Sequence, residues 1–372
     1  MKVIAFYLPQ FHCIPENDKW WGKGFTEWVN VKKAKPLFDK HYQPRTPMNK
    51  NYYNLLNNDV LEWQVKLANQ YNIYGFCFYH YWFSGKKLLE KPIEKFLNNK
   101  NLNTHFCLCW ANESWTNVWA NGNASVIMEQ KYGTKKDWKN HFDYLLSFFK
   151  DERYITNNNK PLLVIYRPEL IDCLEEMLDY WNKLAIESGF DGIEYAYQNV
   201  SYALSKKCNN SLFDYAIEYQ PNWALALQKE TKLQLLKKNI LLFFEKKLNI
   251  NLREKIQIFS NLKIVEYDEI WNSIIKMKPR YDISVPGAFV DWDNTPRKGN
   301  RGLVINHASP EKFEKYFIQL TKKAQNEYKK DMIFIFAWNE WAEGGYLEPD
   351  EKNKYGYLEA IKKTIDKIGG NK

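Results

Sequence analysis

Cysteine is scarce in this chain of 372 residues, which contains six. No two cysteines are spaced as Cys-x-x-Cys, so the sequence indicates neither a disulfide scaffold nor a thiol site for zinc or redox chemistry. Cys77, Cys107 and Cys109 stand inside apolar runs, and we expect their thiols to be buried as small hydrophobic groups.

Long apolar runs are also missing. No stretch approaches the ~18 apolar residues that indicate a membrane-spanning helix. The apolar run after Lys2 reaches Pro9 within a few residues, which is too short for the hydrophobic region of a secretory signal peptide. We therefore expect a cytoplasmic protein, with a substrate that the cell makes or handles internally.

Aromatic side chains, by contrast, are in excess: the chain has 15 Trp, 25 Tyr and 22 Phe. Tryptophan is nearly as frequent as glycine, of which there are 16. A hydrophobic core does not require so many indoles, because each carries an N–H group that must find a partner when buried. The composition is otherwise that of a soluble globular chain, with 45% hydrophobic and 26% charged residues.

The net charge of +9 is mildly basic for this length and does not by itself indicate a nucleic-acid partner. Most of the excess lies between Lys229 and Lys263, with nine basic and three acidic residues. Residues 225–248 have the pattern of a basic amphipathic helix. Such a helix either packs on the protein with its lysines in water, or lies on the inner face of an anionic membrane, which would make the protein peripheral.

Short apolar runs alternate with helical patterns along the whole chain, which is typical of a parallel sheet covered by helices. No Gly-x-Gly-x-x-Gly or P-loop follows a strand, which disfavours a doubly wound sheet. We expect a single α/β domain, residues 1–372, folded as a (β/α)₈ barrel with extended loops and a long helical insertion between strands six and seven. The eight predicted strands cover residues 3–8, 74–79, 105–110, 161–166, 192–197, 213–217, 284–290 and 332–337. Predicted helices include 59–71, 136–149, 170–187, 310–329 and 355–368.

The residues that follow the strands form the active face of such a barrel. Aromatic faces beside carboxylates and amides suit a sugar, because its C–H face stacks on a ring and its hydroxyls pair with planar polar groups. We expect the indoles in these positions to form the wall of a sugar-binding cleft; the alternative is that they close the top of the barrel beneath the loops. Ten tryptophans qualify: Trp20, Trp21, Trp28, Trp82, Trp110, Trp115, Trp119, Trp292, Trp338 and Trp341.

The clearest motif is WNEWAEG, residues 338–344, directly after the last predicted strand. Glu340 and Glu343 are three apart, so on a helical turn their Cβ atoms would lie roughly 5–6 Å apart. Two carboxyl groups at about 5 Å can act on one glycosidic bond with retention of configuration. Repulsion and burial beside tryptophan would raise the pKa of one, so that it acts as an acid while the other stays ionised. Two solvated loop acids are the alternative.

Two further acidic motifs leave other possibilities open. Glu113, in the pair Asn112-Glu113 after the third strand, is a rival catalytic residue or a binding or structural one. The triplet Asp291-Trp292-Asp293 resembles the motif with which some glycosyltransferases hold a metal and a nucleotide sugar, but such triplets are common by chance. His12 and His80 are distant in sequence from other histidine or cysteine ligands, and we expect no metal site and no cofactor.

Several motifs together resemble the bacterial WbsX-like family: residues 6–12 (FYLPQFH), 21–28 (WGKGFTEW), 78–83 (FYHYWF), 109–113 (CWANE) and 338–350. That family is associated with O-antigen and capsule biosynthesis, and its domain resembles glycoside hydrolase family 99, the endo-α-mannosidases. The resemblance implies that Glu340 takes the proton of the sugar's 2-hydroxyl, which attacks its own anomeric carbon. It implies that Glu343 protonates the leaving oxygen and later activates the acceptor, and that the sugar is manno-configured. Residues 116–122 (TNVWANG) depart from the family, which often carries arginines and an aspartate there.

We therefore expect a carbohydrate-active enzyme of surface-polysaccharide metabolism, with a retaining mechanism that uses Glu340 and Glu343. Its partner would be an oligosaccharide or a lipid-linked glycan, not a nucleic acid. A nucleotide-sugar-dependent glycosyltransferase and a non-catalytic glycan-binding protein are the alternatives. The residues expected to bind substrate are Tyr7, His12, Trp28, His80, Tyr81, Trp82, Trp110, Asn112, Glu113, Trp292, Asp293, Arg297, Trp338, Asn339 and Trp341.

Overall fold

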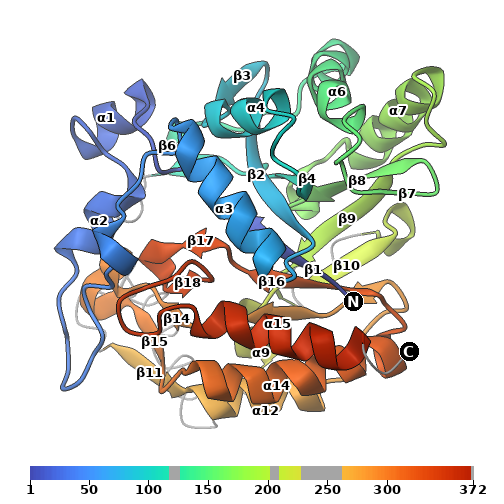
Figure 1. Cartoon of the computed structure of the whole chain (residues 1–372). Coiled ribbons are helices and arrows are strands. Elements are labelled where there is room, and N and C mark those ends of the chain that lie inside the picture. Colours follow the sequence, from blue (N-terminus) through green and yellow to red (C-terminus); the bar gives the residue numbers. More distant parts are fainter. Residues whose placement is uncertain (117–125, 202–208, 228–261, 370–372) are drawn as a thin grey trace, which may run out of the picture.

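The computed structural model describes residues 1–116, 126–201, 209–227 and 262–369 (Figure 1). The predicted basic helix over 225–248 therefore lies almost entirely outside the described residues. Its first residues belong to the short helix α9 (Asn222–Leu227). Within the described ranges, none of the helices combines the length and apolar character needed to span a bilayer.

The described strands build a nearly closed barrel of nine parallel strands, which confirms the predicted (β/α)₈ fold. Neighbouring strands run parallel at every pairing around the barrel. In order around it they are β12 (Ser284–Val285), β10 (Tyr215–Glu218), β9 (Glu194–Asn199), β8 (Lys160–Ile165), β4 (His105–Trp110), β2 (Gly75–Phe83), β1 (Lys2–Tyr7), β16 (Met332–Phe336) and β13 (Gly287–Phe289).

The ninth strand arises because the predicted seventh strand is split at Pro286. Its first part, β12, pairs with β10, and its second part, β13, pairs with β16, so the two halves meet the two edges of the sheet. Proline has no N–H to donate to a ladder, which interrupts the pairing at this point. A Cβ on Gly287 would lie 1.9 Å from the carbonyl oxygen of Glu218, so glycine is needed where the backbones approach.

Helices cover the outside of the barrel, each burying one apolar face against the strands (Figure 1). Helix α6 begins with a capping box between Thr134 and Asp137, and the Ser309 hydroxyl caps α14. The predicted helix over 310–329 ends at Lys323 and continues as a π-helical turn, η5 (Ala324–Tyr328). The covering helices are α3 (Asn58–Gln70), α4 (Lys91–Asn98), α6 (Lys135–Phe149), α7 (Leu174–Glu187), α12 (Tyr267–Lys276), α14 (Pro310–Lys323) and α15 (Gly356–Gly369).

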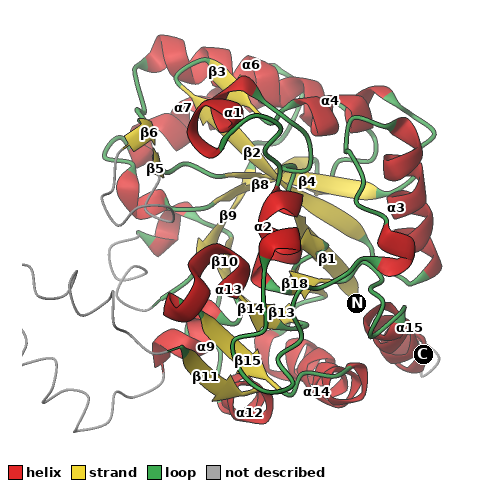
Figure 2. Ribbon diagram, turned by 90° about the vertical axis from the view of Figure 1, so that its left-hand side faces the viewer, coloured by secondary structure: helices red, strands yellow, loops and turns green. Residues whose placement is uncertain are grey.

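Short elements gather at the end of the barrel where the strands terminate. Figure 2 looks onto this end, with α1, α2 and α13 in front of the strands. Three small sheets lie here or beside it: β11 (Lys263–Glu266) with β15 (Leu303–Asn306) and β14 (Trp292–Asp293), β17 (Asn339–Glu340) with β18 (Gly345–Tyr346), and β5 (Trp115–Thr116) with β6 (Val126–Met128). The short helices are α1 (Pro15–Trp21), α2 (Glu27–Lys33), α13 (Thr295–Lys298) and η6 (Trp341–Glu343).

The remaining elements are short and lie in connections. Strand β3 (Lys86–Leu88) forms a hairpin with β2, and β7 (Thr156–Asn157) forms one with β8. The remaining 3₁₀ turns are η1 (Met48–Lys50), η2 (Pro168–Leu170), η3 (Asn210–Leu212) and η4 (Gly299–Arg301).

Candidate active site

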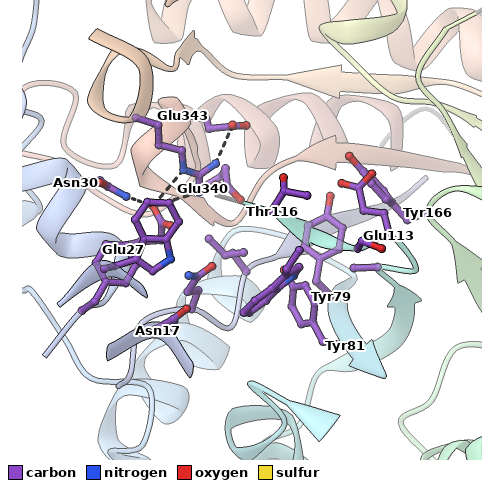
Figure 3. A pocket seen from close by; sticks show the side chains of 18 of the residues that line it. Asn17, Glu27, Asn30, Tyr79, Tyr81, Glu113, Thr116, Tyr166, Glu340 and Glu343 are labelled. Carbon is purple, nitrogen blue, oxygen red and sulfur yellow. Dashed lines mark hydrogen bonds and ion pairs between the residues drawn. The ribbon is translucent and has the colours of Figure 1, made fainter. Parts of the chain in front are cut away.

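A cavity of about 750 Å³ opens where the barrel strands end (Figure 3). This is the end at which barrels of this type carry their active sites. Five of the predicted site residues line it: Glu340, Glu343, Arg297, Tyr81 and Glu113. The other lining residues are Leu8, Gln10, Asn17, Trp21, Phe25, Glu27, Asn30, Lys33, Tyr79, Ala111, Ser114, Trp115, Thr116, Tyr166, Tyr219 and Phe336.

A tight hairpin after β16 positions the two predicted catalytic glutamates. Glu340 ends β17 and Glu343 ends η6, immediately before β18. Gly344 closes the turn with φ of +72°, a left-handed conformation that favours glycine. Asn339 anchors the hairpin to the chain after β1, because its side chain accepts from the Leu8 N–H at 2.8 Å and donates to the Leu8 carbonyl at 3.0 Å. Asn339 thus supports the turn and does not line the cavity.

The tryptophans of the motif hold this turn from the protein side. Trp341 stacks on Tyr346 with 3.7 Å between ring centroids, and its indole N–H donates to Glu348 at 2.7 Å. Trp338 is fully buried and packs edge-to-face on Phe76. Neither indole reaches the cavity, so both act on the glutamates through the backbone of the turn.

Arg297, from α13, joins three carboxylates of the cavity, those of Glu27, Glu340 and Glu343. Its Nη2 donates to Glu340 at 2.6 Å, and its Nη1 lies 2.7 Å from Glu343. Its Nη2 and Nε lie 3.1 and 3.2 Å from one oxygen of Glu27, which comes from α2. Asn30, one turn along α2, donates to the same oxygen of Glu27 at 3.4 Å. The side chains of Glu340 and Glu343 are therefore held within the span of one guanidinium group.

The charge of this cluster is unbalanced, because one guanidinium serves three carboxylates. Burial is the largest influence on Glu340 and raises its pKa to about 8, although Arg297 opposes it. The charges of Glu343 and Glu27 act in the same direction as burial. At neutral pH the cluster therefore retains a proton, which is the condition for one carboxyl group to act as an acid beside an ionised partner.

The opposite side of the cavity carries a second acidic centre, around Glu113 (Figure 3). Arg167 lies 3.2 Å from Glu113 and also pairs with Glu169. Asn112 fixes Arg167, because it accepts from the Arg167 N–H at 2.7 Å and donates to the Arg167 carbonyl at 2.8 Å. Burial raises the pKa of Glu113, Arg167 opposes the rise, and Glu169 adds to it. Asn112 is therefore a support for this centre and not a lining residue.

Tyrosines also line the cavity: Tyr79, Tyr81, Tyr166 and Tyr219. Tyr79 and Tyr219 are in hydroxyl contact at 3.2 Å, and Gln198 donates to the Tyr79 hydroxyl at 3.1 Å. Burial raises the pKa of Tyr81, and the charge of Glu340 raises it further. Burial also raises the pKa of Tyr166, and the charges of Glu113 and Glu343 add to that rise. These phenols stay protonated at neutral pH and offer flat rings with polar hydroxyls to a ligand.

The predicted tryptophan wall needs correction, since Trp21 and Trp115 are the members that line the cavity. Trp20 is 38% exposed but is not part of the lining, and Trp119 lies outside the described residues. The physical reason is that these indoles pack against other apolar side chains of the core, and some also find a hydrogen-bond acceptor there: Trp28 donates to the carbonyl of Tyr53 at 2.8 Å, for example. The structure packs six of the ten inside the protein: Trp28, Trp82, Trp110, Trp292, Trp338 and Trp341.

Three other predicted binding residues also lie outside the cavity. Tyr7 points away from it and donates its hydroxyl to Gln64 at 2.6 Å. His12 bonds through Nδ1 to a backbone carbonyl three residues earlier, and burial lowers its pKa to about 4. His80 contacts His141 at 2.9 Å between Nε2 atoms, and burial lowers the pKa of His80 to about 3. Both of these predicted histidines are neutral groups of the packed interior.

The acidic triplet is a buried structural cluster. Arg45 donates to Asp291 at 2.7 Å, and His41 and Gln43 bond to one oxygen of Asp293 at 2.8 and 2.6 Å. Burial would raise the pKa of Asp293, but the hydrogen bond from His41 and the charge of Arg45 bring it to about 2. Asp293 and Trp292 therefore do not line the cavity. Over the described ranges, no set of three or more histidine, cysteine or acidic side chains is arranged to hold a metal ion.

Sequence reasoning missed several lining residues, above all Glu27, Asn30 and Tyr166. Tyr166 follows β8 directly, so its position after a strand could have marked it. Glu27 stands in the motif at 21–28, but nothing local connects it with Arg297, which is 270 residues away in sequence.

Comparison with solved structures supports the fold. Two structures of the GH99 endo-α-mannosidase from Bacteroides thetaiotaomicron, one in complex with bis-tris-propane, superpose with TM-scores of 0.56 and 0.58. Each covers 99% of this chain and 97% of the other, at 12% identity. A structure described as a glycoside hydrolase-like protein gives 0.57 at 10% identity, over 98% of this chain and 93% of the other.

Sequence comparison identifies the family. Two curated relatives, both named uncharacterized protein WxcX and from two strains of Xanthomonas campestris pv. campestris, are 34% identical over 366 residues. The match covers 98% of this chain and 49% of theirs, so the chain spans about half the length of these relatives. The family described as Glycosyltransferase WbsX matches residues 3–361. The chain therefore belongs to the WbsX glycosyltransferase family.

Proposed function

We propose that the protein is a carbohydrate-active enzyme that cleaves or transfers manno-configured glycosyl units in bacterial surface-polysaccharide metabolism. The observation that carries the proposal is the cavity in which Glu340 and Glu343 contact the same guanidinium group, Arg297. Two carboxyl groups held this close favour retention, because inversion needs room for a water molecule between them. Family membership supports the substrate class, and the barrel supports the kind of catalyst.

The proposed reaction moves one proton into and one out of the pair. Glu340 takes the proton of the 2-hydroxyl while O2 forms a bond to the anomeric carbon. The bond from that carbon to the leaving oxygen breaks, and Glu343 gives its proton to that oxygen. The acceptor hydroxyl or water then attacks the anomeric carbon of the 1,2-anhydro sugar, and the bond from that carbon to O2 breaks. Glu343 takes the proton of the acceptor, and Glu340 returns the first proton to O2.

The electrostatics of the pair favour a second assignment of roles. Burial raises the pKa of Glu340 to about 8, so in the free protein Glu340 is the member that holds the proton. That observation favours Glu340 as the acid and Glu343 as the base or nucleophile.

Substitution of each glutamate tests the function and separates the roles. Glu340→Gln and Glu343→Gln should each lower turnover of a natural glycan by about 10²- to 10⁴-fold, the usual worth of a general acid or base. With an aryl glycoside whose leaving group needs no proton, the variant of the acid should regain activity and the variant of the base should not. The exposed Glu175→Gln, on α7, is the matched control. Full activity in both variants would contradict the proposal.

The two alternative functions make different predictions. A nucleotide-sugar transferase with its metal on the acidic triplet would need Asp291 and Asp293 to leave Arg45 and His41. Calorimetry supports it if nucleotide-sugar binding requires both Mn²⁺ and one of these aspartates. A non-catalytic glycan-binding protein would bind oligosaccharides tightly without turnover, in the native chain as in the glutamine variants.

A lipid-linked glycan substrate, a cytoplasmic location and a contact of residues 225–248 with the inner face of the membrane belong to the same proposal. The net basic charge of this stretch is what supports the contact. Exchange of Lys237, Lys238, Lys246 and Lys247 for glutamate should abolish co-sedimentation with anionic liposomes. Unchanged co-sedimentation would remove the membrane contact.

A further inference from the structure

Glu27 is the member of the carboxylate cluster that comes from outside the barrel strands and their hairpin. It opens helix α2 and is buried, with 4% of its surface exposed. Its N–H donates to the Gln10 carbonyl at 3.1 Å, which ties the start of α2 to the chain after β1. The next residue, Trp28, packs its ring on Trp341 at 5.4 Å between centroids. The position of Glu27 is therefore fixed by the hydrogen bond of its own N–H and by the packing of the next residue, Trp28.

Glu27 takes up two of the three nitrogens of Arg297. Nε and Nη2 both point at one oxygen of Glu27, and the same Nη2 also donates to Glu340. A guanidinium that faced Glu340 alone could present two parallel N–H groups to it, which is the strongest arrangement of such a pair. In this structure Arg297 makes such a contact, with two parallel N–H groups, to neither Glu340 nor Glu343.

We propose that Glu27 is a positioning residue that divides the Arg297 guanidinium between itself and the catalytic pair, and so keeps Glu340 less well neutralised than a simple arginine pair would. This inference rests on the proposed function for its catalytic meaning. Its physical content concerns the charge balance of Glu340 and can be measured without any substrate.

The groups that face Glu340 come from several elements. They are Arg297 from α13, Glu343 from η6, Glu27 from α2, Tyr81 from β2 and Tyr219 after β10. The two tyrosines are neutral at neutral pH, so the charges that act most strongly on Glu340 are those of Arg297, Glu343 and Glu27. Lys33 from α2 also lines the cavity, and Lys298 from α13 interacts with Glu343. The Glu27 charge is among the causes that raise the pKa of Glu340. Its removal leaves Arg297 free to face Glu340 and Glu343 alone.

Titration by ¹³C NMR with glutamate labelled at the side-chain carboxyl carbon tests the inference on the whole protein. The Glu340 signal is assigned by its loss in Glu340→Gln. In Glu27→Gln the pKa of Glu340 should fall by about 1 or more, a tenfold weaker hold on its proton. Glu27→Asp, which keeps the charge but withdraws it by one methylene, should give a smaller fall and serves if the glutamine variant does not fold.

Glu16→Gln is the matched control, because Glu16 is an ion-paired glutamate of the neighbouring helix α1 and does not line the cavity. It should leave the Glu340 titration unchanged. An unchanged or raised pKa of Glu340 in both Glu27 variants would overturn the inference. If the enzyme is active, the kcat/KM pH profile has a limb that reports the ionisation of Glu340. In the Glu27 variants this limb should shift by the same amount as the pKa of Glu340 measured by NMR, and a merely structural role of Glu27 would not produce that shift. Absence of turnover in every assay would count against the proposed function, while the titration still decides the role of Glu27.

Discussion

Single side chains in this protein are assigned to packing or to the cavity by their exposure. Trp115 is partly exposed, lines the cavity and contacts Tyr81 edge-to-face at 5.2 Å. Trp110, the last residue of β4, is 2% exposed and packs on Trp181 of α7. Alternate side chains of a strand point to the two faces of the sheet, and the side chain of Trp110 points to the face that the helices cover.

This difference predicts opposite phenotypes for two tryptophans. Trp115→Ala should weaken oligosaccharide binding by about 10- to 50-fold, since half of an indole face contributes on the order of 2 kcal/mol. Its fold should survive. Trp110→Ala should instead lower the free energy of unfolding by about 3–5 kcal/mol. Calorimetry with the glycan and urea denaturation measure the two effects. Equal affinity of Trp115→Ala and the native protein would contradict the assignment of Trp115 to the cleft.

Among single residues, the sequence predicted those site residues that lie close together in the chain. Glu340 and Glu343 share one turn, and their spacing marked them as a pair. Arg297 was expected near the site because it follows a strand. That it bridges Glu340 and Glu27 depends on contacts 43 and 270 residues apart in sequence, and no local pattern encodes such contacts.

At the scale of the elements, a buried ion pair between Arg45 and Asp291 fixes the irregular segment 34–47, which connects α2 to η1. Arg45 donates to Asp291 and, at 3.3 Å, to the carbonyl of Gly344, in the turn that carries Glu340 and Glu343. The side chains of Arg45 and Asp291 are 6% and 11% exposed. The segment, the chain that follows β13 and this turn therefore share one buried ion pair.

Removal of one partner of this pair should be costly. Arg45→Met leaves Asp291 buried without its cation, and we expect a loss of about 3–5 kcal/mol in the free energy of unfolding. The double variant Arg45→Met/Asp291→Asn leaves no uncompensated charge at this position and should be more stable than the single one. Chemical denaturation of the three proteins measures the difference. A double variant that is less stable than Arg45→Met would show that the pair does not couple the segment to the barrel.

The regular elements were predictable because their patterns are periodic and local. Seven of the eight predicted strands are confirmed within a few residues, and β4 matches at both ends. The seventh strand was read as continuous because Pro286 stands in an otherwise apolar run. Its division between two neighbouring strands depends on how the barrel closes, which the run itself does not reveal.

For the molecule as a whole, buried acids make stability depend on pH. Burial raises the pKa of Glu340 to about 8, and that of Glu348 and of Glu218 to about 7, from an ordinary 4.5. Glu348 is fully enclosed and accepts hydrogen bonds from Tyr53, Gln64 and Trp341. Between pH 4.5 and 8 the unfolded chain releases these protons while the folded chain holds them, so the contribution of these three acids to stability is greatest at low pH and falls as the pH rises.

Glu348 should therefore add a downward slope to the free energy of unfolding from pH 5 to pH 9, on the order of 3 kcal/mol in total for a group this buried. Glu348→Gln should flatten this slope, because its side chain does not ionise. Urea denaturation at pH 5, 7 and 9 compares it with the native protein and with the exposed control Glu175→Gln. Equal slopes in all three proteins would exclude Glu348 as a source of the pH dependence.

The central proposal for the whole molecule is that Glu340 and Glu343 form one catalytic pair at the mouth of the barrel and act with retention. The ¹H NMR signal of the anomeric proton in the first product formed from a manno-configured oligosaccharide tests this most directly. The native protein should give a product with the configuration of the substrate, and the double variant Glu340→Gln/Glu343→Gln should give none. An inverted product, or equal turnover by the double variant, would contradict the account.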